Sequence, residues 1–291
     1  MFEYILYNNK MKKILAVTGG VDSMFLMYRF RDEKDTVVAH FNHGTRKSAD
    51  DDAKLVRRMA LEYGLEFFDK KAELGPDVSE AEARKARYDF LYEMVDKYNG
   101  DAKIYTAHHL NDLAETIVIN LVRGTGWRGL APFSDTKVVR PFIAEKMTKS
   151  DILAEAAKEG IIYRQDPTNT EDNYLRNRLR EKVSLLGRDE LLKIAELYEK
   201  QVVLRSEIEE TCESIASEMC DDNKYPREIF RDLDENVAME ILREVCAANN
   251  ISLTRPQLHD LLIAVREYLP GKKFNLPKDR FVGFRKNWFS F

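Results

Sequence analysis

The residues best suited to chemistry form a short polar run directly after the apolar stretch ILAV: Thr18, Gly19, Gly20, Val21, Asp22 and Ser23. The two glycines let the backbone approach an anion closely and adopt positive φ without penalty. The residues after them open a helix, whose unpaired amides and dipole favour phosphate. Because a bare carboxylate would repel phosphate, we expect Asp22 to hold Mg²⁺ against a bound polyphosphate. The alternative is a tight turn in which Asp22 or Ser23 only caps the helix.

A second group of candidate residues follows the fourth expected strand. His108, Asp112 and Glu115 are spaced four and three residues apart, so on a helix they would share one face. Two carboxylates and an imidazole beside a polyphosphate could hold Mg²⁺, with Asp112 as a ligand, or could hold an amine. The alternative is an exposed first turn whose acids complement the helix dipole.

A third group is basic. Arg176 and Arg180 are four residues apart, with Asn177 alongside, so two guanidinium groups and an amide would share one side of a helix. This arrangement suits recognition of phosphate or of an adenylate. Taken alone, it is equally typical of a salt-bridged surface helix.

Alternating strand and helix patterns must position these groups. We expect buried strands over residues 12–18, 36–42, 66–72 and 102–108, and helices over residues 22–32, 48–63, 79–98 and 111–122. Strand and helix in turn, with short connections, indicate an α/β fold with a mainly parallel, doubly wound sheet and helices on both faces. Ligands bind at the carboxyl ends of such strands, so we expect the first two groups to meet at one edge of the sheet.

The pattern changes in the second half of the chain. Residues 123–142 contain three glycines and two prolines and fit no helix or long strand, so we expect a functional loop there. Further elements are expected as helices over 148–160, 173–186, 188–220, 235–249 and 256–267, a linker over 221–226, and a hairpin-like tail. The expected domains are 1–187, a connector helix and linker over 188–225, and a small α+β domain over 226–291.

Composition narrows the class of protein. With 44% hydrophobic residues and a net charge of −4, the chain can bury a core but does not resemble a nucleic-acid binder overall. Three cysteines without a C-x-x-C pair disfavour a disulfide framework, an iron–sulfur cluster and a zinc site. No signal-peptide pattern and no apolar run of about 20 residues occurs, so we expect a soluble, cytoplasmic protein with no membrane partner. Residues 1–11 could be an edge strand or an upstream extension.

The run at residues 18–23 closely resembles the S-G-G-x-D-S loop of the N-type ATP pyrophosphatases, with Thr18 in place of Ser. Two further motifs make the chain similar to the tRNA(Ile)-lysidine synthetase family. H-H-x-D-D-Q-x-E-T followed by R-G-[ST]-G matches residues 108–116 and 123–126, where Asn111 and Leu113 replace Asp and Gln. D-x-x-N followed by R-N-x-x-R matches Asp166, Asn169, Arg176, Asn177 and Arg180. The resemblance covers almost the whole chain and includes NHGTRKSADDDA (42–53), EAEARKARYDFL (80–91), RPF (140–142) and LPKDRFVGFRKN (276–287).

The resemblance implies a PP-loop ATPase fold of the adenine nucleotide alpha-hydrolase-like kind and a ligase that uses ATP and Mg²⁺. In that reaction the wobble cytidine of a tRNA(Ile) with a CAU anticodon is adenylated at its C2 oxygen, and free L-lysine then displaces AMP. The residues it assigns to catalysis are Asp22, His108, Asp112, Glu115 and Arg176. Those it assigns to ATP binding are residues 18–23, His43, Arg87, Arg123 and Arg180. Asp112 and Glu115 would bind the lysine amine or a second metal, and Arg176 the lysine carboxylate or the adenylate phosphate.

Contacts with RNA are expected at two places. Trp127 and Arg128 could stack on the splayed anticodon, although simple packing of the loop explains them equally well. The basic tail, with seven bases and two acids between residues 266 and 286, is expected to contact the tRNA backbone through Lys272, Lys273, Arg280, Arg285 and Lys286. The sequence does not decide whether the protein forms a homodimer.

Two other functions remain as alternatives. A tRNA-thiolating PP-loop enzyme is disfavoured because that chemistry needs cysteines near the loop, and all three cysteines lie beyond residue 211. A non-catalytic relative that binds ATP or tRNA without turnover is motivated by the three departures at Thr18, Asn111 and Leu113.

Overall fold

The computed structural model describes residues 11–44, 49–72, 75, 78–164 and 174–291, without the side chains of residues 80 and 174–177. The chain forms two compact units, Met1–Tyr198 (unit 1) and Glu199–Phe291 (unit 2). The boundary between them falls inside one long helix, α8 (Arg188–Glu218). Within the described ranges, no helix is both long enough and apolar enough to cross a membrane.

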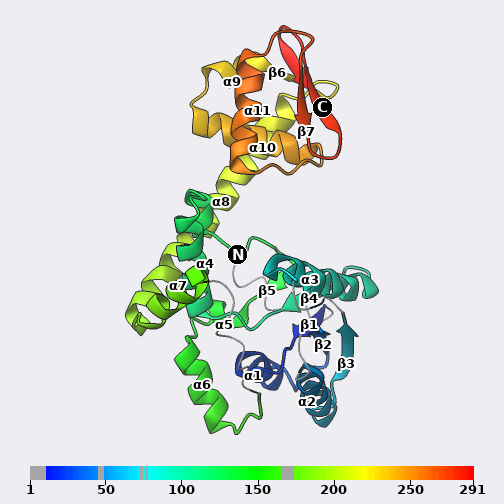
Figure 1. The fold of residues 1–291 in the computed structure, drawn as a ribbon, viewed down its shortest axis with the longest axis vertical. Coiled ribbons are helices and arrows are strands. Elements are labelled where there is room, and N and C mark those ends of the chain that lie inside the picture. The colour runs from blue at the N-terminus through cyan, green and yellow to red at the C-terminus, as the bar shows by residue number, and fades with distance from the viewer. Residues whose placement is uncertain (1–10, 45–48, 73–74, 76–77, 165–173) are drawn as a thin grey trace. The chain divides into compact units, whose positions relative to one another are not determined.

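Unit 1 is built around a parallel sheet of five strands in the order β3-β2-β1-β4-β5 (Figure 1). The strands are β1 (Lys12–Ala16), β2 (Thr36–Asn42), β3 (Glu66–Lys71), β4 (Ala102–Tyr105) and β5 (Val138–Val139). The central strand β1 pairs on both sides, because Ile14 lies opposite Val37 of β2 and Ile104 of β4. The expected parallel α/β fold is therefore confirmed.

Helices cover both faces of this sheet. Successive β1 residues point to opposite faces, as a strand requires. Leu15 and Val17 pack against α1 (Val21–Arg29), α2 (Ala49–Glu62) and α6 (Lys149–Lys158), whereas Ile14 and Ala16 pack against α3 (Glu80–Lys97). A further cluster joins α4 (Leu110–Val122), α5 (Pro141–Ala144), α7 (Tyr174–Ser184) and the start of α8.

Local sequence explains several helix boundaries. Ser79 caps α3 in a capping box with Glu82, and Thr148 caps α6 in the same way with Asp151. These caps satisfy amides of the first turn that have no partner within the helix.

The segment 123–142 is more ordered than its glycines and prolines suggest. It contains a 3-10 helix, η2 (Trp127–Leu130), the strand β5, and the first residues of α5. The fifth strand escapes sequence analysis because it has only two residues, too few to show a periodic pattern.

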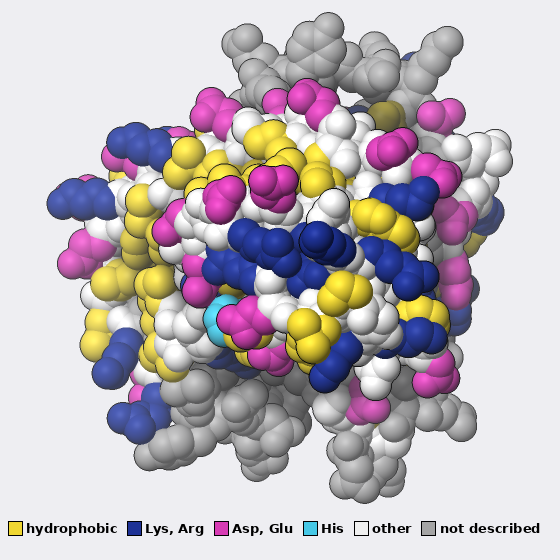
Figure 2. All heavy atoms as spheres, turned by 90° about the horizontal axis from the view of Figure 1, so that it is seen from above, with side chains coloured by type: hydrophobic (Ala, Val, Ile, Leu, Met, Phe, Trp, Pro, Cys, Tyr) yellow, Lys and Arg dark blue, Asp and Glu magenta, His cyan; other side chains and the backbone are white. Residues whose placement is uncertain are grey.

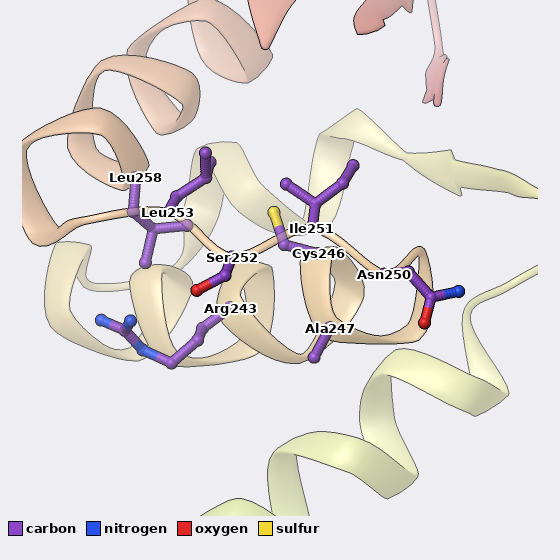
Figure 3. Close-up of a pocket in the computed structure, with 8 residues that line it drawn as sticks. All are labelled: Arg243, Cys246, Ala247, Asn250, Ile251, Ser252, Leu253 and Leu258. Atoms are coloured by element: carbon purple, nitrogen blue, oxygen red, sulfur yellow. The ribbon is translucent and has the colours of Figure 1, made fainter. Parts of the chain in front are cut away.

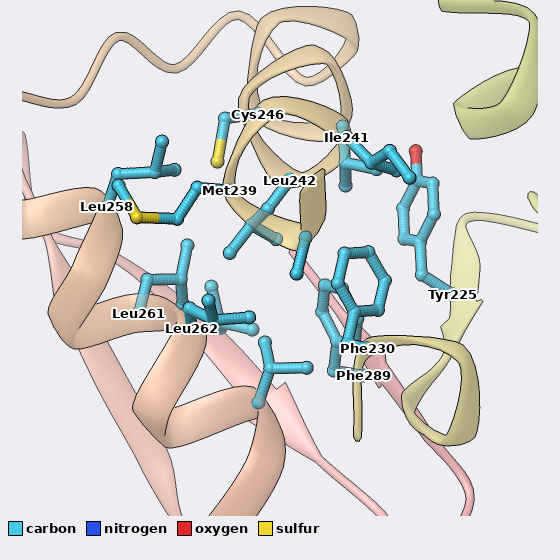
Figure 4. Packing of buried hydrophobic residues seen from close by; sticks show 14 of the residues in the cluster. Tyr225, Phe230, Met239, Ile241, Leu242, Cys246, Leu258, Leu261, Leu262 and Phe289 are labelled. Carbon is cyan, nitrogen blue, oxygen red and sulfur yellow. The ribbon is translucent and has the colours of Figure 1, made fainter. Parts of the chain in front are cut away.

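Unit 2 packs helices on an antiparallel sheet of four strands in the order β6-β9-β8-β7. Its strands are β6 (Lys224–Pro226), β7 (Lys273–Leu276), β8 (Arg280–Phe284) and β9 (Trp288–Ser290), and its helices are α9 (Arg227–Asp232), α10 (Glu235–Ala248) and α11 (Arg255–Glu267). Figure 4 shows aromatic residues of the core, among them Phe230 and Phe289, beside aliphatic residues of α10 and α11. The expected linker over 221–226 is wrong, since Lys224–Pro226 pair with β9.

The buried side chain of Arg227 connects several segments of unit 2 by hydrogen bonds. The side chain is 1% exposed and donates to three backbone carbonyls, from Nε to Val265 (2.6 Å), from Nη1 to Arg285 (2.9 Å) and from Nη2 to Tyr268 (2.7 Å). These carbonyls solvate the buried charge and tie α11 and the segment between β8 and β9 to α9.

Candidate active site

The glycine run connects β1 to α1 at the carboxyl edge of the sheet. Gly19 has φ +98°, and a Cβ there would lie 3.3 Å from Cβ of Asp52 on α2. At Gly20 a Cβ would meet nothing closer than the Thr18 hydroxyl at 3.9 Å. Gly19 is therefore required by backbone conformation and helix packing, whereas Gly20 leaves open space above the backbone.

The start of α1 is suited to an anion. Gly20 is the N-cap residue and, as a glycine, offers no side chain to cap the amides that follow it. The Ser23 hydroxyl is used within the loop, because it accepts from the Thr18 amide (3.1 Å) and donates to the Gly20 carbonyl (2.9 Å). The uncapped amides and the open space at Gly20 fit the phosphates of ATP, while Ser23 stabilises the loop rather than pointing into it.

The Asp22 carboxylate is bound by a lysine that sequence analysis missed. The Lys149 Nζ lies 2.5 and 2.7 Å from the two oxygens of Asp22, 127 residues earlier in the chain. Lys149 is the first residue of α6, and its amide donates to the Asn111 side chain (2.9 Å). Asn111 thus positions Lys149 through its side-chain oxygen, an acceptor that the Asp of the resembling family would also offer.

His109, rather than His108, lies beside the acidic residues. Its Nε2 is 3.4 Å from Oδ2 of Asp112 and 3.9 Å from Oδ1 of Asp22. Helix α4 begins at Leu110, so His108 lies before the helix, and the expectation that it shares a face with Asp112 is wrong. His109 therefore connects the glycine run to the start of α4.

The two acidic side chains of α4 are in different surroundings. Loss of hydration raises the pKa of Asp112, an effect that the charge and the backbone amide of His109 oppose. Burial also raises the pKa of Glu115, which is 9% exposed and bound by Nε of Arg180 at 3.2 Å. Within the described residues, no group of three or more His, Cys, Asp and Glu side chains is arranged to hold a metal ion. Asp22 and Asp112 offer the oxygen donors that Mg²⁺ prefers, but both Asp22 oxygens are engaged by Lys149.

Leu113 has a structural explanation. Its side chain is 0% exposed and belongs to the cluster of α4, α5 and α8. An amide there would be buried in an apolar cluster, so leucine stabilises the packing at this position.

The remaining predicted residues are dispersed. The His43 ring lies 4.8 Å from Phe41 after β2, and Arg123 is exposed at the end of α4. Arg128 lies over the Trp127 ring at 5.0 Å, so these two side chains pack together in η2. The side chains of Arg176 and Asn177, and residues Asp166 and Asn169, lie outside the described part of the chain.

Arg87 is one of three arginines whose positive charge acts on His108. Burial, together with the nearby charges of Arg140, Arg87 and Arg84, lowers the pKa of His108 to about 3. His108 is therefore neutral near pH 7, and its Nδ1 lies 2.8 Å from the hydroxyl of Thr106. Sequence analysis singled out Arg87 but not Arg140.

Unit 2 presents basic and aromatic side chains on its sheet. Lys273 lies over the Phe281 ring at 3.8 Å, and Arg285 over the Trp288 ring at 5.9 Å. Figure 2 shows Lys and Arg side chains gathered in one area of the face in view. The expected contact between this tail and RNA stays a prediction.

A cavity of about 430 Å³ lies in unit 2 between α10 and the start of α11 (Figure 3). Apolar side chains such as Ile251 and Leu253 line it, and Arg243 at its rim is paired with Glu240 at 3.5 Å. The cavity contains none of the residues that sequence analysis predicted.

Comparison with known proteins identifies the family. Residues 2–185 match the family described as PP-loop domain, which covers most of unit 1. The chain belongs to the PP-loop family. Membership implies that unit 1 uses ATP, in agreement with the open loop at Gly20.

Curated PP-loop relatives point to a more specific activity. The tRNA(Ile)-lysidine synthase of Persephonella marina is 34% identical over 195 residues, which are 62% of this chain and 42% of that protein. The enzyme of the same name from Clostridium tetani is 38% identical over 194 residues, which are 61% of this chain and 41% of that protein. The chain thus spans less than half of the length of either relative.

A solved structure shares the PP-loop fold. The U34-tRNA thiolase NcsA from Methanococcus maripaludis, with its [4Fe-4S] cluster, superposes with a TM-score of 0.55. It is 17% identical, and the match covers 67% of this chain and 73% of that one. This likeness concerns the fold alone.

Proposed function

We propose that the protein is a tRNA(Ile)-lysidine synthase, a ligase that joins L-lysine to the wobble cytidine of a tRNA(Ile) with a CAU anticodon. The cytidine C2 oxygen attacks the α-phosphorus of ATP and pyrophosphate leaves. The lysine amine then attacks C2, loses a proton and displaces AMP. The names of the curated relatives support this reaction.

The observation that carries the proposal is the contact of His109 with both Asp22 and Asp112. It brings the ATP loop and the acidic start of α4 into one site, as a reaction between an adenylate and an amine requires. Asp112 and Glu115 carry the charge that attracts the lysine ammonium. Their raised pKa values reflect burial without enough positive charge, which a bound ammonium would supply.

ATP has a defined place in this proposal. The amides that open α1 bind phosphate oxygens, and the open backbone at Gly20 lets them approach. Mg²⁺, when bound, offsets phosphate charge, and Asp22 would hold it. The Lys149 side chain then moves its ammonium group away from Asp22 and onto the phosphates. There the ammonium offsets the negative charge of the leaving pyrophosphate.

The experiment uses labelled ATP, L-lysine and a tRNA(Ile) with the CAU anticodon. We expect free AMP to be released only when lysine is added, and lysidine to appear at the wobble position. Without lysine, pyrophosphate should form only in the amount that accompanies adenylation of the tRNA. AMP release without any need for lysine would point to another acceptor, and ATP binding without AMP would point to a non-catalytic relative.

A substitution at Asp22 tests whether the reaction takes place at this site. Asp22→Ala should abolish turnover while leaving tRNA affinity within a few-fold, and full activity would remove Asp22 from the mechanism. Incorporation of sulfur into the tRNA would favour thiolation, although the three cysteines all lie in unit 2 and two of them are buried.

A further inference from the structure

A group of positive side chains lies at the carboxyl ends of β4 and β5. Arg84 and Arg87 come from the first half of α3, and Arg140 follows β5 directly. All three arginines act electrostatically on His108, which follows β4. Arginines from two segments distant in sequence, α3 and the residue after β5, therefore concentrate positive charge at the sheet edge that also carries the ATP loop.

Two of these arginines lack part of their hydrogen bonding. The Nε atoms of Arg87 and Arg140 are buried and have no hydrogen-bond partner among the described residues. Burial lowers the pKa of both guanidinium groups, so the folded protein disfavours their charged form. Asp135 interacts electrostatically with Arg140. However, the two carboxylate oxygens of Asp135 accept hydrogen bonds from the Tyr92 hydroxyl and the Lys137 amide. A small anion that reached the half-buried guanidinium groups would offset this cost.

The ring of Phe133 packs against the Arg140 guanidinium group and restricts its position. Phe133 has φ +67°, a conformation that a bulky residue rarely adopts. Its ring lies 4.3 Å from the Arg140 guanidinium carbon and 5.4 Å from the His108 ring. Backbone strain of this kind is kept where a site needs a side chain in one place.

We infer that Arg87 and Arg140 form an anion subsite that takes the carboxylate of the amino-acid substrate. The inference rests on the proposed function and adds an orientation to it. The basic and the acidic regions lie next to consecutive residues of the chain. His108 lies near the arginines, and His109 lies near Asp22 and Asp112. A basic amino acid carries both charges that these regions oppose, with its ammonium toward the acids and its carboxylate toward the arginines.

An RNA phosphate is the competing occupant. The two orphaned Nε atoms are fully buried, and a small carboxylate can approach such groups more closely than a bulky phosphodiester chain. The chain also offers more exposed cations for RNA, among them Lys273 and Arg280 in unit 2.

The first test changes the substrate and leaves the protein intact. L-Lysinamide keeps both amines but replaces the carboxylate by a neutral amide. With the full chain, ATP and the CAU tRNA, we expect its KM to exceed that of L-lysine by about 10- to 100-fold, as for loss of a charge-assisted contact. Equal KM values for the two compounds would overturn the inference. No lysine-dependent AMP release at all would instead overturn the proposed function.

The second test connects the preference to the arginine. Arg140→Gln should bring the KM ratio of lysinamide to lysine close to one, mainly by raising the KM for lysine. AMP transfer to the tRNA without lysine should persist in this variant, which shows that the site is folded. Lys137→Met, which removes an exposed cation two residues after Asp135, should keep the ratio of the unchanged protein.

Two results would contradict the assignment. An unchanged ratio in both Arg140→Gln and Arg87→Gln would show that the arginines do not sense the carboxylate. A raised KM for tRNA with an unchanged ratio would give the subsite to an RNA phosphate. If both variants failed to fold, equal KM values for lysine and lysinamide in the unchanged protein would still overturn the inference.

Discussion

Replacing Lys149 by Met removes the ammonium that lies on Asp22 and keeps a side chain of similar length. In the structure Lys149 is 36% exposed and Asp22 30%, and both carboxylate oxygens lie within 2.7 Å of Nζ. If the ammonium moves to the phosphates when ATP binds, the variant loses one charge-assisted contact with them.

The size of the effect follows from that contact. A hydrogen bond to a charged group contributes about 1.5–3 kcal/mol, which corresponds to about 10- to 150-fold weaker ATP binding. Stability should fall by only about 1–2 kcal/mol, because the pair is intermediate between an exposed and a buried ion pair.

Calorimetric titration with ATP and Mg²⁺, without tRNA, measures the affinity directly. Lys158→Met on the same helix is the matched control, since Lys158 is 70% exposed and lies 3.7 Å from Glu155. ATP binding by Lys149→Met as tight as that of the control would refute a role for this lysine in binding phosphates.

Further substitutions test other parts of the structure. Gly20→Ala should keep the melting temperature, because a Cβ there meets only a hydroxyl at 3.9 Å, yet weaken ATP binding at least about tenfold; Gly19→Ala should cost about 1–2 kcal/mol of stability from its φ of +98° alone. The Glu115→Gln variant should become more stable than the unchanged protein as pH rises above 4.5, the ordinary pKa of a glutamate. The reason is that the pKa of the buried Glu115 is raised, so its ionisation costs stability above that pH. Melting temperatures of the two proteins that change in parallel from pH 4 to 8 would contradict this. Arg227→Met should destabilise unit 2 by about 3–5 kcal/mol, seen as early loss of amide-exchange protection there, whereas the exposed Arg231→Met should change little.

The sequence by itself determined the first four strands of unit 1, the helices that follow them, and the position of the glycine run between β1 and α1. The strand β2, TVVAHFN, is buried along its whole length and is rich in apolar residues. The glycines before Asp22 lie between the end of β1 and the start of α1. Such features depend on neighbouring residues, so they can be recognised along the chain. The acids of α4 were recognised for the same reason.

Only the tertiary structure decided which side chains complete the site. Lys149 reaches Asp22 from 127 residues away, and nothing in the TKSD sequence around it indicates that partner. His109 replaces His108 because α4 begins one residue after His109, a shift that spacing alone does not resolve. Arg140, whose buried Nε has no hydrogen-bond partner among the described residues, directly follows a strand of only two residues. The pairing of β6 with β9 joins segments over 60 residues apart. Contacts between distant segments depend on the packing of the whole domain, so local patterns do not encode them.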